Sequence, residues 1–116
     1  HLKSTFKAEL SLGKSAFDLL KIMHPTPAVC GLPKESAMQF INQNEGYKRE
    51  FYTGFIGEYS DKNSQLFVNL RCMQIINNKP LLYVGCGITA ESNPQLEFLE
   101  TENKAQTMRE ILVPLP

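Results

Sequence analysis

The chain has 116 residues, with 12 basic and 12 acidic side chains and a formal net charge of zero. Hydrophobic residues make up 42% and charged residues 21%, close to ordinary globular usage, which excludes a disordered or collagen-like protein. The neutral balance argues against a nucleic-acid partner, and the absence of an apolar run of ~20 residues argues against a membrane-spanning one.

The first half of the chain predicts one strand and two helices. Residues 2–10 alternate loosely and contain β-forming side chains, which favours a strand. Residues 14–23 place apolar side chains at near-helical spacing. Residues 24–33 hold three prolines and a glycine and predict a shaped loop. A second helix is expected over 33–45, because Pro33 suits its first position.

The second half predicts three strands and a final helix. Residues 51–60, 65–77 and 81–89 are rich in aromatic and β-branched residues, and short polar turns separate them. Ser92-Asn93-Pro94 predicts the start of a helix of about five turns, which Pro114 ends. We therefore expect an α+β fold, with an antiparallel sheet made of a three-stranded meander plus the N-terminal strand, packed with three helices.

The three cysteines, Cys30, Cys72 and Cys86, form no C-x-x-C pair, and their number is odd. We expect no disulfide framework in a chain of this size without a visible signal peptide. Free thiols suit a reducing compartment, so the predicted location is the cytoplasm.

The final helix carries the first candidate site. Spacings of three and four residues put Glu97, Glu100 and Lys104 on one face. Two carboxylates there can supply oxygen ligands to Mg²⁺. The alternative is that Glu100 and Lys104 form an ordinary i,i+4 surface pair.

Four further residues are suited to binding an anion. Gly85 and Gly87 end a predicted strand, where glycine lets an anion approach backbone N–H groups; a bulge is the alternative. Arg71 is predicted in mid-strand and needs an anionic partner, either a ligand carboxylate or an internal glutamate. Tyr52 could place its phenol beside the same anion, or belong to the core.

Together these motifs resemble the chorismate-binding enzyme family, and the resemblance covers essentially the whole chain in the right order. The run HPTPAVCGLPK at 24–34 is similar to the signature loop of the isochorismate synthases. The final helix, EFLETENK at 97–104, is similar to the family's E-[W/F]-x-E-T-x-x-K pattern. Other matching positions are His1-Leu2, Arg49, Tyr52, Gly54, Gly57, Leu70-Arg71 and the run YVGCGI at 83–88.

The resemblance implies magnesium-dependent chemistry on chorismate and assigns roles residue by residue. The implied roles are metal ligands for Glu97 and Glu100, a clamp on the enolpyruvyl carboxylate for Tyr52 and Arg71, backbone donors to a substrate carboxylate for Gly85 and Gly87, a cation near the ring carboxylate for Lys104, and a pocket residue beside the leaving hydroxyl for His1.

Ala28 indicates the subclass. Relatives that make anthranilate or aminodeoxychorismate usually have threonine at this position, so Ala28 is similar to the isochorismate branch, in which water attacks the ring. The product would feed menaquinone or a catechol siderophore. A salicylate, anthranilate or aminodeoxychorismate synthase is the alternative.

The family domain is more than twice as long as residues 1–116, which therefore resemble its C-terminal segment. In the family, the lysine that activates water, the glutamate that acts as general acid and a further magnesium ligand lie upstream. We therefore expect an incomplete domain that is inactive alone and self-associates through uncovered apolar faces. A non-catalytic, self-associating fragment is the alternative from a different class.

Overall fold

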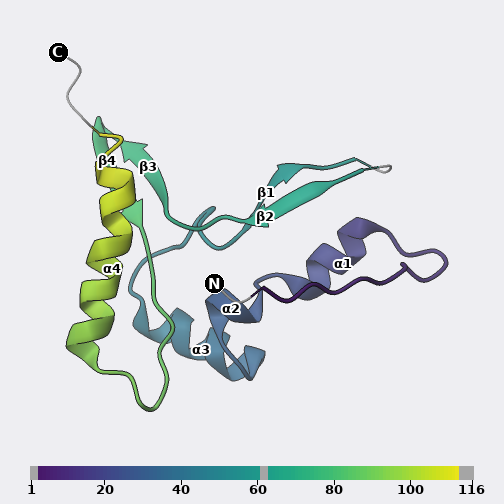
Figure 1. Ribbon diagram of the computed structural model, residues 1–116, viewed down its shortest axis with the longest axis horizontal. Coiled ribbons are helices and arrows are strands. Elements are labelled where there is room, and N and C mark those ends of the chain that lie inside the picture. The colour runs from purple at the N-terminus through teal and green to yellow at the C-terminus, as the bar shows by residue number, and fades with distance from the viewer. Residues whose placement is uncertain (1–2, 61–62, 113–116) are drawn as a thin grey trace.

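The structure, a computed structural model, describes residues 3–60 and 63–112 and has an α+β fold, as predicted (Figure 1). The elements in chain order are α1 (Ala16–Met23), α2 (Pro27–Cys30), α3 (Lys34–Asn44), β1 (Phe55–Glu58), β2 (Gln65–Val68), β3 (Cys72–Ile76), β4 (Lys79–Tyr83) and α4 (Pro94–Arg109).

The three predicted helices form close to their predicted positions, and capping side chains fix where α1 and α4 begin. The Ser15 side chain accepts a hydrogen bond from the Asp18 amide, and the Asp18 carboxylate accepts one from the Ser15 amide, which starts α1 with a capping box. The Asn93 side chain caps α4, and Pro94 follows it. The predicted loop over 24–33 contains one short helix, α2, that the sequence analysis did not anticipate.

The strands form two separate antiparallel hairpins, so the single sheet with a three-stranded meander was wrong. Strand β1 pairs with β2, and β3 pairs with β4. The predicted strand over 65–77 is interrupted between β2 and β3, because Arg71 has a φ of 48° and turns the chain. The turn between β3 and β4 forms where predicted, with Asn77 and Asn78 both at positive φ, as tight hairpin turns require.

Two further strand predictions need correction: one strand does not form over the described residues, and another has different bounds. Residues 3–10 form no regular structure, and residue 2 lies outside the described residues. Within the described ranges no neighbouring strand pairs with this segment, and an unpaired strand lacks the ladder hydrogen bonds that define it. The strand predicted over 81–89 begins earlier and ends at Tyr83, so residues 84–89 form an irregular connection to α4.

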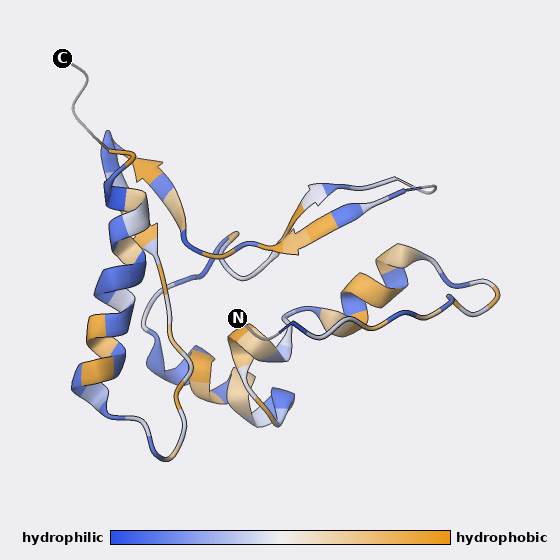
Figure 2. Ribbon diagram, viewed as in Figure 1, coloured by the Kyte–Doolittle hydropathy of each residue, from blue (hydrophilic) through white to orange (hydrophobic). Residues whose placement is uncertain are grey.

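The molecule is open and buries little. Its accessible surface is 10297 Å², whereas a compact monomer of 13.1 kDa exposes about 6,400 Å². Its radius of gyration is 16.9 Å, against about 13 Å for a compact domain of this length. Figure 2 shows hydrophobic residues along α1 and β2, where Ile22 is 75% and Phe67 66% exposed. Among residues 3–60 and 63–112, the buried apolar residues are Cys30, Tyr52, Tyr83 and Ala105.

Both faces of the β1–β2 hairpin are apolar. Phe55 pairs with Val68 on one face, and Ile56 pairs with Phe67 on the other. A hairpin with one solvated face alternates apolar and polar side chains, so apolar pairs on both faces are typical of strands covered on both sides. The hairpin therefore has the composition of an interior layer.

Candidate functional site

The start of α4 places the two candidate carboxylates. The Asn93 cap begins the helix, and the Glu97 carboxylate Oε1 accepts a hydrogen bond of 2.7 Å from the Ser92 hydroxyl. One turn later, Glu100 forms an ion pair with Lys104, the i,i+4 pair that the sequence allowed. The Glu100 side chain is about half exposed, so its carboxylate is accessible as well as paired.

Lys104 connects α4 to the segment that follows β4. Its Nζ donates a hydrogen bond of 3.0 Å to the Gly85 carbonyl while it also pairs with Glu100. A Cβ added at Gly85 would lie 2.7 Å from the Tyr52 hydroxyl, so the phenol lies directly against the Gly85 backbone. The structure therefore brings together Tyr52, Gly85, Lys104 and Glu100, which are widely separated in sequence.

Tyr52 is buried and packs against aromatic and cationic neighbours. It is only 8% exposed, and its ring stacks on Tyr83 with the centroids 5.7 Å apart. The Arg49 guanidinium lies 5.8 Å from the Tyr52 ring. Burial raises the pKa of Tyr52, which further favours the neutral phenol, the form that can donate a hydrogen bond. Among the described residues, its hydroxyl has no hydrogen-bond partner.

Cys86 lies beside the same carboxylates. Burial, the neighbouring Glu97 carboxylate and the charge of Glu100 all raise the pKa of the Cys86 thiol, which keeps it protonated. The thiol lines a mainly apolar cavity of about 340 Å³ between α4 and the preceding segment. The cavity lining is Cys86, Ile88, Ser92, Pro94, Glu97, Phe98 and Thr101.

The other predicted site residues are not joined to this group. Arg71 was expected in mid-strand, but it lies exposed in the bend before β3, and within the described ranges it forms no ion pair. Ala28 lies exposed in α2. A Cβ added at Gly87 would meet no atom within 4 Å, so its backbone is open to approach. His1 lies outside the described residues.

Glu97 and Glu100 carry the carboxylate oxygens that Mg²⁺ prefers as ligands. Mg²⁺ is commonly held by one or two protein carboxylates, with substrate oxygens and water completing the octahedron. Glu97 and Glu100 supply two carboxylates on one helix face, one turn apart. In the part of the chain that the structure describes, no group of three or more His, Cys, Asp or Glu side chains is placed to hold a metal ion. The remaining magnesium ligands would have to come from the substrate, from water or from residues outside those that the structure describes.

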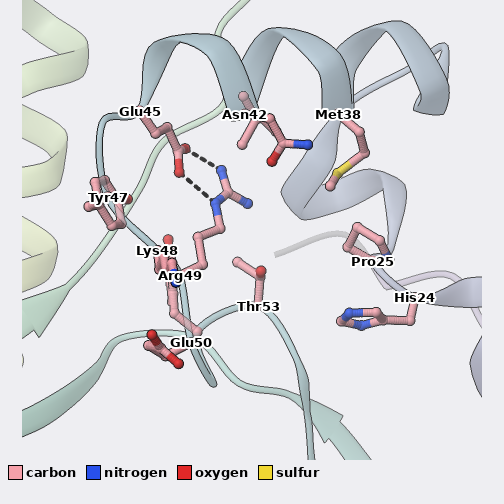
Figure 3. A pocket seen from close by; sticks show the side chains of 12 residues that line it. His24, Pro25, Met38, Asn42, Glu45, Tyr47, Lys48, Arg49, Glu50 and Thr53 are labelled. Carbon is pink, nitrogen blue, oxygen red and sulfur yellow. Dashed lines mark hydrogen bonds and ion pairs between the residues drawn. The ribbon is translucent and has the colours of Figure 1, made fainter.

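A second cavity, of about 420 Å³, contains an ion pair that the sequence analysis did not single out (Figure 3). The Arg49 Nε donates a hydrogen bond of 2.8 Å to the Glu45 carboxylate, and the Arg49 Nη2 also pairs with it. The hydrogen bond to Glu45 raises the pKa of Arg49. The i,i+4 spacing of Glu45 and Arg49, at and just past the end of a predicted helix, was the feature of the sequence that could have indicated this ion pair.

A family model described as chorismate binding enzyme matches residues 1–113. The chain belongs to the chorismate-binding enzyme family. The predicted resemblance is therefore confirmed at the level of the family. The match includes every position at which the sequence suggested a site residue.

Curated relatives within the family differ in their reactions. The chain is 39% identical over 110 residues to an isochorismate synthase of Bacillus subtilis, which covers 93% of the chain and 28% of the relative. It is 36% identical over 113 residues to the chloroplastic isochorismate synthase of Catharanthus roseus, covering 97% and 20%. It is 37% identical over 112 residues to anthranilate synthase component 1 of Archaeoglobus fulgidus, covering 96% and 27%.

The chain thus spans about a quarter of the length of these relatives. No solved structure matches the chain. Among the described residues, no helix combines the length and the apolar character needed to cross a membrane.

Gly85→Ala should displace Tyr52, because the new methyl group would lie 2.7 Å from the phenolic oxygen. We expect a loss of near-ultraviolet circular dichroism from the Tyr52–Tyr83 stack and a destabilisation of about 1–3 kcal/mol. Gly87→Ala is the matched control, since open space surrounds that position. Equal spectra and equal unfolding midpoints for the two variants would contradict the close approach.

Proposed function

We propose that the chain provides the substrate- and metal-binding segment of an isochorismate synthase, which converts chorismate to isochorismate with Mg²⁺. The observation that carries this proposal is the position of Lys104, between the Glu100 carboxylate and the Gly85 carbonyl, with the Tyr52 phenol against Gly85. A cation, a phenol, glycine backbone and a carboxylate thus lie close together, which suits a dianionic substrate bound beside a divalent ion.

Each residue has a proposed part in binding. Glu97 and Glu100 would hold Mg²⁺, which when bound would supply positive charge to neutralise the ring carboxylate of the substrate. Lys104 lies near the same carboxylate and adds a positive charge there. The neutral phenol of Tyr52 donates a hydrogen bond to the enolpyruvyl carboxylate. The planar guanidinium of Arg71 binds the same carboxylate through two parallel hydrogen bonds.

The remaining assignments concern orientation and the nucleophile. The Gly85 and Gly87 backbone donates to a substrate carboxylate, and the open space around Gly87 supports this role. We assign to Ala28 the accommodation of water as the nucleophile, and to His1, which lies outside the described residues, a role at the leaving hydroxyl. The general acid and the base that activates water come from a part of the enzyme outside these 116 residues. The product would feed menaquinone or a catechol siderophore in the cytoplasm.

Amination of chorismate is the competing reaction, because an anthranilate synthase component is as similar as some isochorismate synthases. Ala28 favours water attack through its resemblance to the isochorismate branch. Salicylate and aminodeoxychorismate synthases are further alternatives with the same substrate.

The surface area supports a role as part of a larger domain. The chain exposes about 3,900 Å² more than a compact monomer of its mass, an excess larger than a standard protein–protein interface buries. The two apolar faces of the β1–β2 hairpin contribute to this excess. We propose that the rest of a chorismate-binding domain covers these faces.

In isolation, the same faces should pair with each other. We expect the purified chain to sediment as dimers or larger species at micromolar concentration, because exposed apolar patches of this extent and open strand edges associate. Phe67→Lys should shift the chain toward monomer. Gln65→Lys, which adds the same charge on the same face of the hairpin, is the matched control. A clean monomer at high concentration would contradict the prediction.

A chimera tests the proposed reaction. In the first chimera, this chain replaces the matching 110-residue segment of the Bacillus subtilis isochorismate synthase. In the second, it replaces the matching 112 residues of the Archaeoglobus fulgidus anthranilate synthase component 1. We expect magnesium-dependent formation of isochorismate by the first chimera. The chain alone should show no turnover, because each missing acid or base contributes about 10²–10⁴-fold.

Product analysis separates the alternatives. Anthranilate from the second chimera, with a folded but inactive first chimera, would overturn the isochorismate assignment in favour of amination. Turnover of chorismate by the chain alone would contradict the expected dependence on upstream residues. Circular dichroism and thermal unfolding of both chimeras establish that each one is folded.

A further inference from the structure

The segment that carries Ala28 is held at both ends by cations, one at the start of α3 and one that pairs with the residue capping its C-terminal end. Lys34, the first residue of α3, donates from Nζ to the Ile22 carbonyl at 3.1 Å and to the His24 carbonyl at 2.7 Å. Arg49, anchored by the C-cap residue of α3, Glu45, donates from Nη1 to the Val29 carbonyl at 2.9 Å. Ala28 lies between these two attachment points.

Local hydrogen bonds alone give this segment little rigidity. Helix α2 is one turn of four residues, closed by bonds from the Val29 and Cys30 amides to the Thr26 carbonyl and from the Gly31 amide to the Pro27 carbonyl. A single turn is not stable in isolation, because nucleation fixes several residues for very few hydrogen bonds. The position of α2 must therefore depend on contacts from outside it.

The placement of Lys34 points to the same role. A cation in the first turn of a helix is unfavourable, because the N-terminal end of the helix dipole is positive. Lys34 occupies that position, and its charge is directed to two carbonyls of the preceding segment. Hydrogen bonds from a charged donor are about twice as strong as neutral ones and offset the unfavourable location.

Arg49 also lies close to Tyr52, a residue of the proposed substrate site. Its guanidinium lies 5.8 Å from the ring of Tyr52. Figure 3 shows the Arg49–Glu45 pair at the end of α3, in the cavity that His24 and Pro25 also line. One side chain thus contacts α3, α2 and the tyrosine whose hydroxyl lies against Gly85.

We infer that Arg49 and Lys34 are positioning residues that fix the segment around Ala28: Lys34 acts from the first residue of α3, and Arg49 through its pairing with Glu45, the C-cap residue of α3. Resting on the proposed function, the inference extends to the reaction: by fixing Ala28 relative to Tyr52, Arg49 controls which nucleophile reaches the ring. Neither residue needs to touch the substrate for this effect.

Hydrogen–deuterium exchange on the 116-residue chain tests the positioning directly and requires no activity. We expect Arg49→Met and Lys34→Met each to increase exchange at the Val29, Cys30 and Gly31 amides by about tenfold or more, since each removes hydrogen bonds from a charged donor. Arg109→Met, which removes an ion pair with Glu102 on α4, is the matched control and should leave these amides unchanged. Unchanged exchange in both variants would overturn the inference.

The choice of nucleophile is measured with the Bacillus subtilis chimera in the presence of ammonium, which competes with water for the ring. We expect Arg49→Met to change the ratio of isochorismate to aminated product, and Arg49→Lys to restore it in part; Arg109→Met should leave it unchanged. This ratio does not depend on how much enzyme is folded, so a purely structural role would not alter it. Faster exchange with an unchanged ratio would overturn the control of the nucleophile. An inactive unsubstituted chimera would contradict the proposed function, and the exchange result would still decide the positioning.

Discussion

Glu100→Gln should reduce isochorismate formation by the Bacillus subtilis chimera by at least about 100-fold and raise the magnesium concentration that it requires. The substitution keeps the shape and the helix propensity of the side chain but removes a negative charge from one of the two carboxylates at the start of α4. Mg²⁺ depends on anionic oxygens, so a neutral amide should bind it poorly. Initial rates across a magnesium titration provide the measurement.

The ion pair with Lys104 makes a control necessary, because losing it also affects stability. Glu102→Gln is matched: Glu102 lies on the same helix and also pairs with a cation, Arg109. Both variants should lose well under about 1 kcal/mol of stability, as exposed pairs do. Near-normal magnesium dependence in Glu100→Gln would remove the metal assignment.

Arg71→Lys should raise the KM for chorismate by about tenfold with a smaller effect on kcat. Lysine keeps the charge but loses the planar fork that binds a carboxylate through two parallel hydrogen bonds. The structure places Arg71 exposed, and no ion pair to a glutamate of the described residues competes for its guanidinium. The measurement is a titration of the Bacillus subtilis chimera with chorismate at saturating magnesium.

Lys79→Arg provides a control for a general change in surface cations, since Lys79 is exposed at the start of β4. We expect its KM to remain unchanged. A normal KM in Arg71→Lys would remove Arg71 from the carboxylate clamp. Loss of stability with normal kinetics would instead assign Arg71 to the turn between β2 and β3, where its φ is positive.

Much of the candidate site was predictable because it depends on local geometry. The spacing of Glu97, Glu100 and Lys104 puts them on one helix face wherever that helix lies, and Asn93-Pro94 fixes where the helix begins. The contact of Tyr52 with Gly85 was not predictable in this way, because it joins residues 33 positions apart through packing on Tyr83.

The sequence by itself determined the α+β class, the start of α4, the turn at Asn77–Asn78 and the order of motifs that marks the family. Capping, proline placement and hydrophobic period act over a few residues, so they operate in any tertiary context. Only the tertiary structure decided that the strands form two hairpins, that Arg71 lies in a bend, and that Lys34 and Arg49 hold the Ala28 segment. Strand pairing and long-range hydrogen bonds depend on which distant groups meet, and local propensity carries no information about that.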